Sequence, residues 1–111
     1  MKTFESLNPA TGEVVGIFPV TTAKEVDDAV SRAQAASDRW SELSFRKRLI
    51  VLRDWASLLT REINNAADLI HRETGKPHSD AALEAALAIE HISWAAKFAP
   101  KVLSQIGRAH V

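Results

Sequence analysis

The sequence predicts a mostly helical chain in which two short strands precede about four helices. Strand-forming residues are concentrated before residue 21, whereas from Thr22 onward apolar residues recur at spacings of three and four, which is typical of helices with one buried face. Gly75 and Pro77 mark a clear helix stop. Two weak strands cannot provide the sheet that such a helical layer should cover, so the sequence predicts an incomplete domain.

The two strands are expected over residues 4–8 and 13–20, on either side of the turn-forming segment Asn8-Pro9-Ala10-Thr11-Gly12. In the second strand, β-branched and aromatic residues dominate. They could form an antiparallel hairpin or two separate edge strands. In either case they need a further layer, because an isolated pair of strands is only marginally stable.

The first helix is predicted to begin after Thr22, because Thr22 and Glu25 have the spacing of a capping box. The apolar residues expected on its buried face are Val26, Ala29, Val30, Ala33, Ala36 and Trp40. Ser44 can cap a second helix. The stripe expected on that helix consists of Leu49, Leu52, Ala56, Leu59 and Ile63, and Val51, Trp55 and Leu58 widen it. Such a wide apolar surface indicates a helix buried between layers.

A break is predicted near Asn64 and Asn65, followed by a third helix that ends at Gly75. Ser79 is expected to cap a fourth helix, which should end near Pro100. The apolar residues of this helix include Ala82, Leu83, Ala86, Leu87, Ile89 and Trp94. Its many alanines would allow another element to pack closely.

Composition excludes several classes of function. Fourteen Lys and Arg balance fourteen Asp and Glu, so no charge excess favours nucleic acid or an anionic membrane as a partner. The chain has no cysteine, which rules out disulfides and thiolate chemistry within it. No apolar run resembles a signal peptide or approaches the roughly 20 residues of a membrane span. We therefore expect a soluble, cytoplasmic protein.

Three segments, in order and at matching spacing, resemble the aldehyde dehydrogenase superfamily over roughly residues 4–103. Residues 8–14 (Asn-Pro-Ala-Thr-Gly-Glu-Val) are similar to the opening of that family. Residues 26–40, with their alanines and Trp40, resemble its first long helix, and residues 72–77 (Arg-Glu-Thr-Gly-Lys-Pro) resemble the turn that closes its third. Each motif alone is weak, but together they are specific.

The resemblance implies a longer α/β parent enzyme with a Rossmann-type cofactor domain, a catalytic domain and a homo-oligomeric assembly. Such enzymes oxidise an aldehyde to a carboxylic acid with NAD or NADP, by way of a nucleophilic cysteine and a glutamate-activated water. Residues 1–104 would be the incomplete amino-terminal part of the cofactor domain. The substrate would be an aldehyde, with a semialdehyde as one candidate.

The chain departs from the family pattern at every position that carries the chemistry. The nucleophilic cysteine, the general-base glutamate motif and the Pro-Trp-Asn stretch are all missing, and no Gly-rich turn follows a strand. We therefore assign no catalytic or cofactor-binding residue, and we expect this chain by itself neither to bind NAD or NADP productively nor to oxidise aldehydes.

Residues 105–111 look foreign to the family and are expected to be a non-native tail. Ile106–Val111 is the translation of ATC GGA AGA GCA CAC GTC, a string found in a common sequencing adapter and followed there by a stop triplet. The adapter requires the preceding codon to end in AG, and Gln105 meets that condition. The alternative is a tail that matches by chance.

Ser6 and Glu73 are the only site residues that the resemblance carries over, as oxygen ligands of a structural hard cation. The commoner alternative is that Ser6 simply ends a strand and Glu73 is a solvated helical carboxylate. The four histidines show no ligand spacing. In particular, Gly75 and Pro77 should break the helix that would align His71 with His78.

A different class of function remains open. The chain could be a free-standing helical interaction or dimerisation module, which would bury the wide apolar surface of the second and fourth helices on a partner. A cooperatively melting, soluble protein would favour the module, whereas molten behaviour would favour the enzyme fragment.

Overall fold

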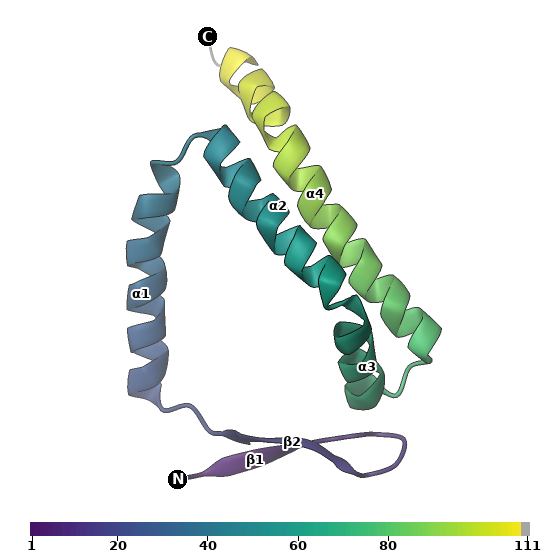
Figure 1. Cartoon of the computed structure of the whole chain (residues 1–111). Helices are drawn as coiled ribbons and strands as arrows, with labels where there is room; N and C mark the ends of the chain where they lie inside the picture. Colours follow the sequence, from purple (N-terminus) through teal and green to yellow (C-terminus); the bar gives the residue numbers. More distant parts are fainter. Residues whose placement is uncertain (110–111) are drawn as a thin grey trace.

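The computed structural model describes the backbone of residues 1–109 and the side chains of residues 1–105. It consists of two strands and four helices, as predicted (Figure 1). The elements, in order, are β1 (Thr3–Leu7), β2 (Val14–Pro19), α1 (Ala23–Ser41), α2 (Phe45–Arg61), α3 (Ile63–Thr74) and α4 (His78–Ala109). None of these helices, over the part of the chain described, is both long and apolar enough to cross a membrane.

The strands form an antiparallel hairpin, which decides between the two arrangements that the sequence left open. Ser6 pairs with Gly16 and Leu7 with Val14, so Val15 is an extra residue that forms a bulge in β2. In the connecting loop, the Asn8 side-chain oxygen accepts hydrogen bonds from the backbone N–H groups of Ala10 and Thr11 at 2.9 and 3.3 Å. This Asx-type turn explains how the loop reverses the chain.

Helix α1 begins as predicted, with both bonds of the capping box. The Glu25 amide donates to the Thr22 hydroxyl at 3.2 Å, and the Thr22 amide donates to the Glu25 carboxylate at 2.7 Å. The backbone bond from Thr22, followed by its side-chain bond, lowers the pKa of Glu25 below the ordinary value of 4.5.

The expectation that α1 buries one face is wrong for this chain. All of its side chains are exposed, including Val26 and Val30, the latter at 64%. The periodicity correctly predicts a helix, but no other element of residues 1–109 packs extensively against the stripe (Figure 1). An apolar helix face can be buried only where a second element is present to cover it.

Helices α2 and α4 run side by side and form the main packed layer (Figure 1). The predicted stripe of α2 faces this contact, since Ala56 is buried and Leu49, Leu52 and Leu59 are half-buried. On α4, Ala96 is buried, whereas Leu83, Leu87 and Trp94 lie on the exposed side. Alanines at the contact allow the two helix backbones to approach closely.

The break between α2 and α3 occurs at Glu62, not at the predicted Asn64 and Asn65. Asn65 stays helical because its side-chain amide donates to the Glu62 carboxylate at 2.7 Å. That bond satisfies a side chain that otherwise competes with the helical backbone. Ile63, which the sequence places on the apolar stripe of the second helix, begins α3 and is half-buried.

Helix α3 ends as predicted at Gly75, which has a left-handed φ of 75°. Helix α4 starts at His78, so the predicted cap at Ser79 is wrong; the carbonyl of Pro77 accepts the first helical bond, from Ala81. The end predicted near Pro100 is also wrong, because α4 continues to Ala109. Proline removes one backbone donor and its ring crowds the carbonyl four residues earlier, which weakens a helix interior, yet the helix continues through Pro100.

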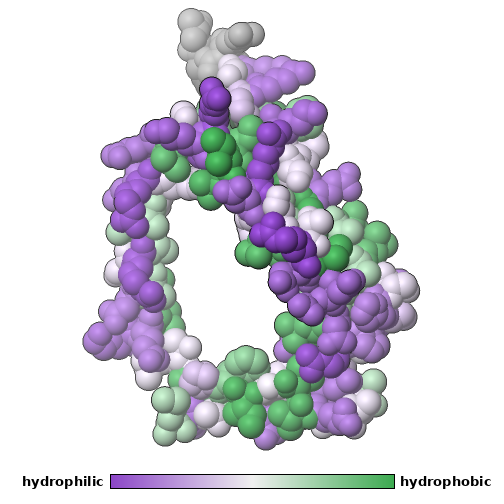
Figure 2. Space-filling view, in the orientation of Figure 1, coloured by the Kyte–Doolittle hydropathy of each residue, from purple (hydrophilic) through white to green (hydrophobic). Residues whose placement is uncertain are grey.

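The structure has a small core. Its buried hydrophobic side chains, among the residues described, are the four alanines Ala56, Ala67, Ala81 and Ala96. The hairpin, α1 and the α2–α4 pair frame an opening, and polar residues line the outer side of α1 (Figure 2). The chain extends over 57 × 39 × 24 Å. Four small side chains leave most of the larger apolar residues exposed.

Candidate functional site

The structure brings Ser6 and Glu73 together. Ser6 lies in β1 and Glu73 in the last turn of α3, and the Ser6 hydroxyl donates a hydrogen bond to the Glu73 Oε1 atom at 2.8 Å. Ser6 is half-buried and Glu73 is exposed. Both residues named from the sequence therefore meet at the junction between the hairpin and α3, although 67 positions separate them.

Local backbone geometry holds this junction. Gly75 ends α3 in the left-handed region, and its amide donates to the carbonyl of His71 at 2.9 Å. Pro9, in the hairpin loop, lies against Gly75 so closely that a Cβ atom added there would be 3.3 Å from Pro9 Cγ. The hairpin loop thus rests on the end of α3, and this contact positions Ser6 beside Glu73.

The donor chemistry of the junction fits a hard cation only in part. A hydroxyl and a carboxylate are oxygen ligands of the kind that Na⁺, Ca²⁺ or Mg²⁺ take, but a calcium ion needs about six to eight oxygens. Within residues 1–109 no group of three or more His, Cys, Asp or Glu side chains is placed to hold a metal. Ser6 and Glu73 could therefore supply two ligands, and backbone carbonyls, water or further chain would have to supply the others.

The turn that follows Glu73 carries contacts that sequence reasoning missed. Lys76 forms an ion pair with Glu84 of α4, and His71 Nδ1 donates to the Lys76 carbonyl at 2.7 Å. The rings of His71 and His78 lie beside each other, with centroids 5.9 Å apart. The helix breaks at Gly75 as predicted, so one helix does not align these histidines, but the reversal of the chain at the turn brings their rings together. Only an interpretation of residues 75–77 as the turn of a helical hairpin, with one histidine on each side of it, could have indicated this.

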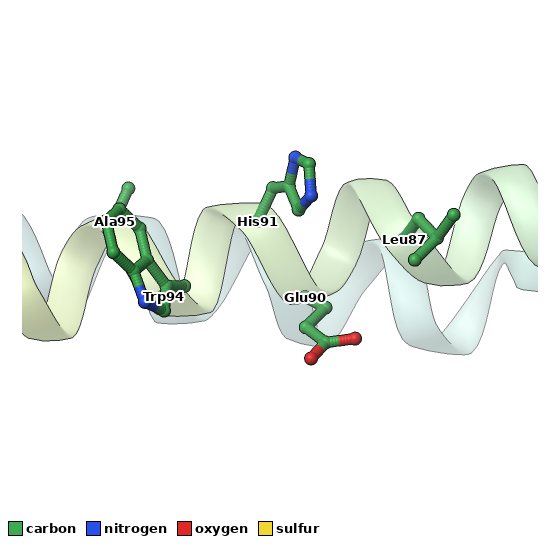
Figure 3. Close-up of a pocket in the computed structure, with 5 residues that line it drawn as sticks. All are labelled: Leu87, Glu90, His91, Trp94 and Ala95. Carbon is green, nitrogen blue, oxygen red and sulfur yellow. The ribbon is translucent and has the colours of Figure 1, made fainter.

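A shallow hollow on α4 is not a second site. Leu87, Glu90, His91, Trp94 and Ala95 line it, and all five come from this one helix. Glu90 and His91, its two titratable residues, point to opposite sides of the helix (Figure 3). They therefore do not form an acid–base pair.

The aldehyde dehydrogenase family profile matches residues 1–109 of this chain. The chain therefore belongs to the aldehyde dehydrogenase family. Among curated members, the glutarate-semialdehyde dehydrogenase of Pseudomonas putida is 35% identical over 101 residues, which are 91% of this chain and 21% of that protein.

Solved aldehyde dehydrogenase structures share the fold of this chain. The succinate-semialdehyde dehydrogenase of Burkholderia pseudomallei superimposes with a TM-score of 0.82 at 36% identity. The NADP-dependent glyceraldehyde-3-phosphate dehydrogenase of Bacillus halodurans, complexed with NADP, gives a TM-score of 0.83 at 28% identity. Each match covers 86% of this chain and 20% of the other. The chain thus spans about one fifth of the length of the relatives that it matches.

Proposed function

We propose that residues 1–104 form the amino-terminal part of the cofactor domain of an enzyme that oxidises an aldehyde to a carboxylic acid with NAD or NADP. The observation that carries this proposal is the uncovered apolar surface on α1 and on the exposed face of α2. The proposal is also supported by coverage: this chain matches only about one fifth of each relative, and the other four fifths of a relative contain most of the structure that could cover this surface. Semialdehydes are the candidate substrates, because two of the relatives described above are semialdehyde dehydrogenases.

In this proposal the 111-residue chain has no dehydrogenase activity of its own. The family attacks the aldehyde with a cysteine thiolate, and the chain contains no cysteine. NAD or NADP, when bound to a complete enzyme, accepts the hydride. The role of this segment would be structural: its helices would cover one face of the dinucleotide-binding sheet in a homo-oligomeric enzyme.

A segment exchange tests the structural role. The 101 aligned residues of the P. putida glutarate-semialdehyde dehydrogenase would be replaced by their counterparts from this chain. We expect a soluble chimera that reduces NAD or NADP in the presence of glutarate semialdehyde, and an inactive protein when the segment is deleted. The isolated chain should produce no NADH or NADPH with the same substrate.

Matched variants within the chimera sharpen this test. Val30→Asp places a charge on the uncovered stripe of α1 and should abolish solubility or activity, because a buried charge without a partner is costly. Ser31→Asp, on the opposite side of the same helix, should leave both unchanged. Equal effects of the two variants would contradict the docking of α1 through its apolar stripe.

We further propose that Ser6 and Glu73 supply two oxygen ligands of a structural cation in the complete enzyme. In the chimera, Na⁺ or Ca²⁺ should raise the melting temperature, and Glu73→Ala should remove that dependence, while alanine at the exposed carboxylate Glu13 should not. If Glu73→Ala changes neither the melting temperature nor its response to either ion, the Ser6–Glu73 bond is an ordinary contact between the hairpin and α3.

The alternative function, a free-standing helical dimerisation module, is favoured by one observation. Val51, Trp55 and Leu58 of α2 form a continuous exposed apolar face. A monodisperse dimer of the isolated chain with a cooperative thermal transition would support the module over the enzyme segment. Sedimentation equilibrium combined with circular dichroism distinguishes the two.

The origin of residues 105–111 is open to a direct test. Helix α4 includes residues 105–109 of this segment, whereas His110 and Val111 lie outside the described residues. We propose that Ile106–Val111 derives from adapter sequence. Amplification of the locus from genomic DNA should then show a different coding sequence after the codon for Gln105. A genuine stop directly after Val111 would contradict this.

The cytoplasmic location expected from the sequence stays a prediction.

A further inference from the structure

The turn between α3 and α4 places two imidazoles side by side. His71 is in the last turn of α3 and His78 is the first residue of α4, and their ring centroids are 5.9 Å apart with the ring planes tilted by 55°. His78 is exposed and His71 is half-buried, so a hydrated ion in solvent can reach both. We propose that His71 and His78 form a two-imidazole site for a first-row divalent ion of the Zn²⁺, Ni²⁺ or Cu²⁺ type.

The hydrogen bond of His71 prepares its ring for this role. Its Nδ1 atom lies 2.7 Å from the Lys76 carbonyl oxygen, and a carbonyl can only accept. Nδ1 therefore carries the proton, and in the neutral ring Nε2 is left with a free lone pair. Metal-binding histidines commonly donate their second ring N–H to a backbone carbonyl, which fixes the tautomer and the ring orientation.

The ring separation is compatible with chelation. With a metal–nitrogen bond of about 2.0–2.1 Å, an ion shared by two imidazoles holds the ring centroids roughly 5 to 6 Å apart. The observed 5.9 Å lies in this range. Imidazole nitrogen favours Zn²⁺, Cu²⁺ and Ni²⁺ over hard ions such as Ca²⁺, so this site differs in chemistry from the oxygen donors Ser6 and Glu73.

The turn between the two histidines is held in place on both sides. Ala67 of α3 and Ala81 of α4 are the most buried side chains of the structure, at 1% and 0% exposure. Lys76 is paired with Glu84, so its ammonium group is compensated rather than left facing an incoming cation. His71 lies at the carbonyl end of α3, where the helix dipole favours positive charge, and His78 lies at the amino end of α4, where it opposes positive charge, so the two dipoles offset each other. With two protein ligands, water would complete the coordination shell.

Calorimetric titration of the 111-residue chain with ZnCl₂ tests the site, at about neutral pH where Zn²⁺ competes well with protons for imidazole nitrogen. We expect one Zn²⁺ per chain. His78→Ala should weaken binding about tenfold or more, because a chelate becomes a single contact. His71→Asn should do the same, although its side-chain amide can still donate to the Lys76 carbonyl and so preserve the turn.

A matched control removes the other two of the four histidines. The His91→Ala, His110→Ala double variant should bind Zn²⁺ as the unmodified chain does, and concentrated urea should abolish the high-affinity event. In NMR spectra, sub-stoichiometric Ni²⁺ should broaden the ring resonances of His71 and His78 first. The proposal would be overturned if the control double variant lost as much Zn²⁺ affinity as His78→Ala and His71→Asn do. Equal Zn²⁺ affinity with and without urea would overturn it as well. Neither result bears on aldehyde oxidation, which the chimera tests separately.

Discussion

Two glycines of this chain adopt the same backbone conformation in different surroundings. Gly12 has a φ of +78° and Gly75 a φ of +75°, values that residues with a Cβ atom rarely adopt. A Cβ added at Gly12 would meet no atom within 4 Å, whereas one at Gly75 would meet Pro9. The pair therefore separates the cost of backbone conformation from the cost of contact with the hairpin loop.

Gly75→Ala should destabilise the hairpin–α3 junction more than Gly12→Ala destabilises the loop. The left-handed conformation costs an alanine about 1–2 kcal/mol at either position, and at Gly75 the close approach to Pro9 adds to this. Amide hydrogen exchange of β1 and of the last turn of α3 measures the effect. Adding Pro9→Ala should recover part of the loss only in the Gly75 variant. Identical effects of the two glycine substitutions would show that Pro9 does not rest on Gly75.

The first turn of α1 should lose stability in acid. Because the folded-state pKa of Glu25 is lowered, its stabilising contribution is complete above the ordinary value of 4.5 and is lost as pH falls through the lower folded value. The Thr22 amide donates to that carboxylate, so its protection factor, which corrects for the intrinsic pH dependence of exchange, should fall in that window. Glu25→Gln should remove the pH dependence at this amide, and a retained dependence would place its cause elsewhere.

At the residue scale, the sequence predicted one of the two pairs of side chains that meet near the end of α3 and missed the other. Ser6 and Glu73 were paired through a family resemblance, and the structure joins them by a direct hydrogen bond. The contact between His71 and His78 cannot be predicted from helix spacing, because that spacing describes residues on one helix only. Their contact depends on the angle at which two helices meet, and that angle is set by packing across the turn.

At the scale of elements, local signals predicted helix starts and stops well. Thr22 with Glu25, Ser44 and Gly75 each satisfy free backbone groups of the helix that they bound, so their effect is independent of the rest of the fold. The predicted break near Asn65 is wrong because its side chain bonds to Glu62 within the helix. The predicted end near Pro100 is wrong because α4 continues through it. The sequence could not reveal that the stripe of α1 would be uncovered, since periodicity does not identify the partner.

Arg48 holds the corner between α1 and α2. Its guanidinium donates to the carbonyls of Leu43 and Ser41, both at 3.1 Å, and lies over the rings of Trp40 and Phe45. A planar group with several donors can satisfy both carbonyls at once, which a lysine ammonium does less well.

Arg48→Lys should therefore loosen this corner although the charge is kept, and Arg48→Ala should loosen it further, by about 1 kcal/mol or more. Exchange of the Leu43 amide, which bonds to the Trp40 carbonyl, reports the change. Arg46→Ala, in the same basic run but exposed, is the control. If it matches Arg48→Ala, general charge rather than the guanidinium geometry supports the corner.

For the molecule as a whole, the buried core is too small to cover its apolar residues. Trp55 and Trp94 are 51% and 59% exposed. We expect the isolated chain to bind the dye ANS and to show tryptophan fluorescence that acrylamide quenches readily. In the chimera with the P. putida enzyme, the same tryptophans should be shielded where new structure covers them. A chain that binds no ANS and melts cooperatively would instead favour the dimerisation module.

Helix α1 is connected to the remainder of the structure almost entirely through its two ends. The capping box secures one end and Arg48 the other, while the helix between them has solvent on every side. Such a segment is a cooperative unit of its own: it can unwind and re-form without disturbing α2, α3 or α4. During synthesis it would emerge early and fold on its own timescale, and a protease should cut within it before it cuts the helical pair.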